Sequence, residues 1–158
     1  KLSVKNPEKI DYVIANCAEC EPLLRLHRQL LKFHAPEVIS AFAQTIDAIG
    51  AKEGIVCIKD HYKGAIEATT ALLPKYPKLR IQILPIVYPA GDEVVMIYEA
   101  TGKVIRPGGL PIEAGVETSV VVYRIREALL PHIADRHWTL VPTLGAGVVV
   151  RIGVVEEE

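Results

Sequence analysis

The side chains best suited to chemistry gather in two short segments of this chain. In the first, Asn-Cys-Ala-Glu-Cys-Glu-Pro, an amide and two carboxylates (Asn16, Glu19 and Glu21) follow directly after an apolar stretch. Such groups can hydrogen-bond to a flavin ring or to ribose hydroxyls. The same composition is typical of a polar turn in which Glu21 and Pro22 simply open a helix. The residues of this segment leave both interpretations open.

The second segment, Tyr-Pro-Ala-Gly-Asp-Glu, places an aromatic ring, a glycine and two acids at the expected start of a helix. These residues are Tyr88, Gly91, Asp92 and Glu93. Glycine allows the main chain to approach a ligand closely, and the first turn of a helix offers free N–H groups. A surface turn whose acids complement the helix dipole would have the same composition.

The cysteines indicate a third kind of chemistry. Cys17 and Cys20 form a Cys-x-x-Cys pair, which can be a redox disulfide or half of a metal site. No second such pair exists, and the five histidines show no metal-ligand spacing, so we predict no metal site. Cys57 lies in an apolar run and is expected in the core. A thiol redox protein stays an alternative, and it requires a depressed thiol pKa.

Motifs for nucleophilic catalysis and for phosphate binding are missing. The sequence has no Gly-x-Ser-x-Gly elbow, no Walker loop and no Gly-x-Gly-x-x-Gly. The segment from Arg106 to Pro111 is rich in glycine, but its prolines predict a rigid loop. The sequence therefore gives little support to nucleophilic catalysis.

Apolar periodicity predicts the elements that position these segments. We expect strands at 11–16, 54–59 and 79–86, and helices at 24–33, 36–49, 63–73 (capped by Asp60) and 93–100. This alternation predicts an α/β, Rossmann-like fold, a largely parallel sheet flanked by helices. Both polar segments would lie where strands end, which is where open α/β sheets bind ligands.

The C-terminal part is predicted to be rich in loops and β-structure. Residues 106–115 are predicted to form a loop, and Trp138–Val141 and Val148–Val155 are predicted to form strands. Residues 119–130 are ambiguous, because residues 120–122 favour a strand whereas residues 124–130 favour a helix. We expect an α/β domain over 1–135 and a β-rich segment over 136–158 that would begin the next domain.

Composition narrows the possible partners and the location. Half of the 158 residues are apolar, 23% are charged and the formal net charge is −1, so a nucleic-acid partner is not expected. No apolar stretch is long enough to span a bilayer, and no secretory signal is evident. Three cysteines suit a reducing compartment. We expect a cytoplasmic protein whose contact with a membrane, at its inner face, depends on partner subunits.

Three motifs together resemble a known family. They are Asn-Cys-Ala-Glu-Cys-Glu-Pro, Tyr-Pro-Ala-Gly-Asp-Glu and Thr-Gly-Lys-Val-Ile-Arg-Pro-Gly-Gly-Leu-Pro, in this order within about the first 115 residues. The combination resembles the C subunit of Rnf-type membrane oxidoreductases. It is also similar to propanediol-utilisation cobalamin reductases, to proline-reductase-associated electron carriers and, more distantly, to the NADH-binding flavoprotein subunit of respiratory complex I.

The resemblance implies an electron-transfer domain that holds FMN, on which NADH stacks to exchange a hydride. Electrons would then pass to iron–sulfur centres outside this chain, in partner subunits or in regions beyond it. The implied cofactor-binding residues are Lys1 at the end of a flavin loop, Asn16, Glu19 and Glu21 along the pocket, and Tyr88, Gly91, Asp92 and Glu93 on the facing wall. Hydride transfer would need positioning by these residues rather than acid–base catalysis.

The sequence departs from the family pattern at three places. The glycine-rich flavin loop would precede Lys1, Val120 and Val122 replace an asparagine and a glycine, and the iron–sulfur region would lie further along. We therefore expect a domain of a longer NADH:acceptor oxidoreductase that is inactive by itself. The alternative is a flavin-less docking or structural module of the same fold.

Overall fold

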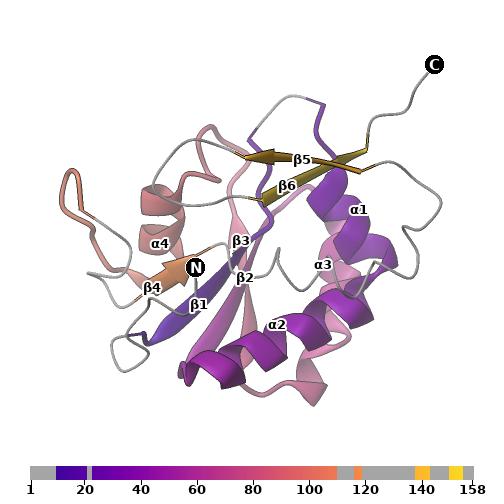
Figure 1. Ribbon diagram of the computed structural model, residues 1–158, viewed down its shortest axis with the longest axis horizontal. Helices are drawn as coiled ribbons and strands as arrows, with labels where there is room; N and C mark the ends of the chain where they lie inside the picture. Colours follow the sequence, from indigo (N-terminus) through magenta and orange to yellow (C-terminus); the bar gives the residue numbers. More distant parts are fainter. Residues whose placement is uncertain (1–9, 21–22, 110–115, 119–137, 143–149, 155–158) are drawn as a thin grey trace.

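The computed structural model describes residues 10–20, 23–109, 116–118, 138–142 and 150–154. Its centre is a parallel four-stranded sheet with the order β3-β2-β1-β4, and a separate antiparallel pair joins β5 to β6 (Figure 1). The strands are β1 (Tyr12–Asn16), β2 (Glu53–Lys59), β3 (Leu79–Leu84), β4 (Val116–Thr118), β5 (Trp138–Pro142) and β6 (Val150–Val154). The helices are α1 (Leu26–Phe33), α2 (Ala35–Ile49), α3 (Lys63–Thr70), α4 (Glu93–Thr101) and a 3-10 turn, Leu73–Lys75. The predicted α/β fold is confirmed.

Helices cover both faces of the sheet, with α1 to α3 on one side and α4 on the other (Figure 1). Side chains of successive residues in a strand point to opposite faces. Val13 therefore packs in the core under α1 to α3, whereas Ile14 packs under α4. The fully buried Phe42 and Met96 fill the two cores. Burial on both faces explains why β2 is a continuous apolar run rather than an alternating one.

Glycine residues end two of the helices. Gly50 ends α2 with a φ of 76°, and Gly102 ends α4 with a φ of 70°. Glycine adopts this left-handed conformation without the cost that a Cβ atom imposes. The prediction that Asp60 caps α3 was wrong. No side chain caps that helix, and Asp60 instead pairs with Lys63 at 2.6 Å, because it lies too far before the first turn.

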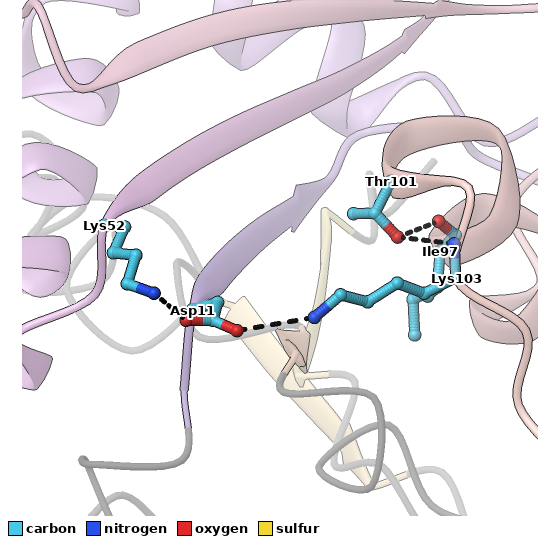
Figure 2. A network of polar contacts seen from close by, with 5 residues as sticks. All are labelled: Asp11, Lys52, Ile97, Thr101 and Lys103. Atoms are coloured by element: carbon cyan, nitrogen blue, oxygen red, sulfur yellow. Dashed lines mark hydrogen bonds and ion pairs between the residues drawn. The ribbon is translucent and has the colours of Figure 1, made fainter.

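Asp11 ties the amino-terminal end of the sheet together (Figure 2). Its carboxylate lies 2.7 Å from the Nζ of Lys52, which precedes β2, and 3.4 Å from the Nζ of Lys103, which follows α4. Hydrogen bonds from Lys52 and Lys103 hold the pKa of Asp11 below its usual value. Thr101 stabilises the same region, since its Oγ1 donates to Ile97 O and accepts from Lys103 N. This end of the sheet is therefore a structural junction, opposite to the end where the polar segments lie.

The C-terminal prediction is confirmed where the structure describes it. Strands β5 and β6 match the two predicted β segments, and residues 106–109 form a turn. The ambiguous segment 119–130 and the proposed domain boundary at 135 lie outside the described residues. Within the described part of the chain, no helix is long and apolar enough to cross a membrane.

Candidate functional site

The chain connections run in opposite directions on the two sides of β1, so the sheet has a topological switch point beside this strand. From β1 the chain passes through α1 and α2 to β2 on one side, whereas from β3 it passes through α4 to β4 on the other side of β1. Ligands of open α/β sheets bind at the carboxyl ends of the strands at such a reversal. Asn16 is the last residue of β1, so the first polar segment begins at this position.

The structure brings the two polar segments together at this switch point. The amide Nδ2 of Asn16 donates to the carbonyl oxygen of Gly91 over 2.9 Å. The N–H of Gly91 in turn donates to the Sγ of Cys20 over 3.1 Å. These partners are 75 and 71 residues apart in the sequence. Residues 16–20, here called the β1 loop, and residues 88–93, here called the α4 turn, therefore form one continuous structure.

Gly91 is required by packing at the contact between the β1 loop and the α4 turn. A Cβ atom at this position would lie 2.1 Å from the carbonyl oxygen of Ala18 and 2.7 Å from the Sγ of Cys20. The sequence suggested that Gly91 would allow the main chain to approach a ligand. In the structure, Gly91 instead leaves room for the main chain of the β1 loop.

The side chain of Glu19 turns into the protein. It is only 8% exposed, its Oε1 accepts from the N–H of His27 over 3.0 Å, and its Oε2 accepts from the hydroxyl of Tyr62 over 3.4 Å. Burial, together with the charge of Glu19, raises the pKa of Tyr62 to about 12. Both carboxylate oxygens therefore have partners within the chain.

A buried lysine supports the same loop from the neighbouring strand. Lys59 is the last residue of β2, and its Nζ donates to the main-chain oxygen of Glu19 over 2.8 Å. Sequence reasoning missed both Lys59 and Tyr62. A signal was present, because a lysine at the end of an otherwise apolar strand needs a polar partner if it is buried.

Three predicted site residues of the α4 turn have side chains that could reach a ligand or the protein. One of these side chains is hydrogen-bonded within the protein, and the other two are accessible to solvent. Asp92 caps α4, since its Oδ1 accepts from the N–H groups of Val94 and Val95 at 3.0 and 3.3 Å. Tyr88 is 81% exposed, and Glu93 is partly exposed in the first turn of the helix. The remaining predicted site residues, Lys1 and Glu21, lie outside the described residues, as do Val120 and Val122.

Cys17, one member of the Cys-x-x-Cys pair, does not have the lowered pKa that a reactive redox thiol needs. All three cysteines are free. Burial raises the pKa of Cys17 far above its usual value and raises that of Cys57 to about 12. A reactive redox thiol requires a lowered pKa, so this argues against the thiol redox alternative. Cys57 is fully buried, which confirms its predicted place in the core. In the residues described, no group of three or more His, Cys, Asp or Glu side chains could hold a metal ion.

Comparisons with known proteins identify the family. Residues 1–125 match the family described as the Nuo51 FMN-binding domain. The cobalamin reductase PduS of Citrobacter freundii is 43% identical over 113 residues, which are 72% of this chain and 25% of that protein. The C subunit of the Na+-translocating ferredoxin:NAD+ oxidoreductase complex of Acetobacterium woodii is 32% identical over 116 residues, which are 73% of this chain and 26% of that subunit. The chain thus spans about a quarter of the length of these relatives.

A solved structure supports the fold independently. The NAD+-reducing NiFe hydrogenase in its H2-reduced state superposes with a TM-score of 0.59 at 20% identity, covering 82% of this chain and 25% of that one. At this identity the similarity concerns the fold alone, whereas the family match covers most of the sequence. The chain therefore belongs to the Nuo51 FMN-binding domain family.

Proposed function

We propose that this chain is the FMN- and NADH-binding domain of an electron-transfer subunit similar to the Rnf C subunit. It would move electrons from NADH, or to NAD+, through FMN and iron–sulfur centres outside residues 1–158. The observation that carries the proposal is the direct contact between Asn16 and Gly91 at the switch point of the sheet. Two segments whose motifs characterise the family meet at the place where such sheets bind ligands.

The chemistry of the accessible groups fits a flavin. A flavin has a flat apolar ring with polar atoms at its edge, and Tyr88 presents an 81% exposed aromatic ring beside the main chain of the α4 turn. Glu93 adds a partly exposed carboxylate that can accept from ribose hydroxyls. FMN would supply the hydride and single-electron chemistry when bound. The chain would bind it, orient it and exclude water.

We assign the predicted residues to two roles in this site. Tyr88 and Glu93 would contact the cofactors, together with Glu21 and Lys1. Asn16, Glu19, Gly91 and Asp92 would hold the main chain around the cofactors, because their side chains or their packing are engaged within the protein. No side chain needs to transfer a proton to the substrate, since hydride transfer depends on alignment.

The relatives suggest the surroundings of the domain. The Acetobacterium protein is a subunit of a complex, so we propose that this chain also works with partner subunits. The domain would comprise residues 1–135, with 136–158 leading into the next domain. It would be cytoplasmic, at the inner face of a membrane through those partners, with no nucleic-acid partner.

The test is an FMN titration followed by quenching of flavin fluorescence, first with this chain and then with the intact protein. We expect saturable binding by the intact protein, and we expect Tyr88→Ala and Glu93→Gln to reduce its NADH oxidation about tenfold or more. Tyr98→Ala is a matched control, since Tyr98 is a 56% exposed tyrosine within α4 rather than in the turn. Wild-type turnover in both site variants would contradict the proposed pocket.

A flavin-less docking or structural module is the second candidate. The observation in its favour is the apolar pair Val120 and Val122, which replaces polar or small residues of the family. This candidate predicts no FMN binding even by the intact protein, so the same titration distinguishes the two functions.

A further inference from the structure

Lys59 is unusual because a charged side chain occupies the interior behind the candidate site. It is only 9% exposed, and lysine is rarely buried to this degree unless its ammonium has a fixed partner. The partner is the main-chain oxygen of Glu19, 2.8 Å away. This hydrogen bond ties Lys59 to the β1 loop, at a residue whose own side chain the proposed function does not place against FMN.

We propose that Lys59 is a positioning residue, which holds the β1 loop against the α4 turn and thereby shapes the flavin site. The inference rests on the proposed function and adds to it a residue that the family motifs do not include. Because Lys59 holds a main-chain segment of the protein itself, its effect on the β1 loop can be tested without a cofactor.

The strand register explains why a lysine is needed here. Asn16, the last residue of β1, pairs with Cys57, so β2 continues two residues further than β1. The last main-chain hydrogen bond between them runs from Cys17 N to Cys57 O, at 3.0 Å. Beyond it the ladder offers Glu19 no main-chain donor from β2. The long side chain of Lys59 supplies that donor, and its loss would leave a buried carbonyl without this partner.

Glu19 is in addition fixed through its side chain, which makes the anchor rigid. His27, in the first turn of α1, donates its N–H to Oε1, and Tyr62, just before α3, donates its hydroxyl to Oε2. Cys20 follows Glu19 directly, and its sulfur accepts from the N–H of Gly91. Because Glu19 and Cys20 are adjacent, a displacement of Glu19 would also move Cys20 and disturb its hydrogen bond with Gly91 of the α4 turn.

The first measurement uses the flavin-free intact protein and reads the position of Cys20. Iodoacetamide labelling, followed by peptide mass spectrometry, reports how well the contact with Gly91 shields the Cys20 thiol. In Lys59→Met we expect labelling of Cys20 to become at least about fivefold faster, because the loop loses its anchor. Labelling of Cys17 and Cys57, which are buried in the core, should stay slow.

The second measurement is the FMN dissociation constant of the same variants. Lys59→Met should weaken binding about tenfold, the effect expected of one charged hydrogen bond, and Lys59→Arg should restore part of it because it keeps a donor. Lys63→Met is the matched control. Lys63 is a neighbouring lysine whose side chain is 72% exposed and pairs with Asp60, so both readouts should stay at wild-type values.

Each outcome decides the proposal. If Lys59→Met is labelled faster at Cys20 but not at Cys17 or Cys57, the proposal is supported. If its Cys20 is labelled at the wild-type rate, the proposal is overturned. Equal acceleration at all three cysteines also overturns it, because Lys59 would then only stabilise the whole fold. If Lys59→Met does not fold, Lys59→Gln, which is too short to reach Glu19 O, takes its place under the same criteria. If the wild type binds no FMN, the proposed function fails while the labelling still decides the role of Lys59.

Discussion

Replacing Gly91 by alanine should separate the β1 loop from the α4 turn. The added Cβ would lie 2.1 Å from the main-chain oxygen of Ala18 and 3.2 Å from its carbonyl carbon. These atoms belong to a main chain that is hydrogen-bonded on both sides, so a rotamer change cannot relieve the overlap. One of the two segments has to move.

The magnitude follows from what this movement breaks. Overpacking costs about 1–3 kcal/mol, and the hydrogen bond from Asn16 to Gly91 contributes about 1 kcal/mol. We therefore expect Gly91→Ala to lower the free energy of unfolding by about 2–4 kcal/mol. Gly108→Ala is the control. A Cβ at Gly108 would have no atom within 4 Å, although φ is +74°, so only backbone strain of about 1 kcal/mol is expected.

The free energy of unfolding of both variants is measured by urea denaturation of the full chain, followed by circular dichroism. FMN titration of the intact protein should in addition show weaker binding for Gly91→Ala than for Gly108→Ala. A loss of stability below about 0.5 kcal/mol for Gly91→Ala, or a loss no larger than that of Gly108→Ala, would refute the argument that the two segments are packed in contact.

Two further predictions concern titratable groups. Because Lys52 and Lys103 lower the pKa of Asp11 in the folded state, their contribution is present above the ordinary value of 3.8 and is lost as the pH falls below it. The stability difference between the wild type and Asp11→Asn should thus be constant from neutral pH down to about pH 5 and disappear on further acidification; a difference independent of pH in urea denaturation would contradict this. Since the pKa of Tyr62 is about 12, ultraviolet absorbance titration of the six tyrosines should contain a late step that Tyr62→Phe removes. The same variant should lose about 1 kcal/mol of stability, because Glu19 loses a donor, and an unchanged titration curve would argue against the buried hydroxyl.

The order of the elements from β1 to α4 was predicted from local sequence, with bounds that lie within three residues of those observed, whereas β4 and the 3-10 turn were not predicted. Continuous apolar runs mark β1 and β2, and the 3.6-residue period marks α2, because a side chain's exposure repeats with the geometry of its own element. A glycine ends α2 and another ends α4, and this signal is local in the sequence. The prediction that Asp60 caps α3 was also based on local sequence, and it failed. An acidic residue shortly before a helix does not reveal whether its side chain can reach the N–H groups of the first turn.

The arrangement of the candidate site depends on contacts between segments that are far apart in the sequence. The motifs marked Asn16 and Gly91 as important, but their contact spans 75 residues, and no local period encodes such a pairing. The family resemblance implied that Glu19 lies along the pocket, and it did not indicate that the side chain turns into the protein. That direction depends on Tyr62 and His27, which approach from α3 and α1 only after the helices have packed on the sheet. A polar side chain takes the partners that burial brings to it, and burial is a property of the whole fold.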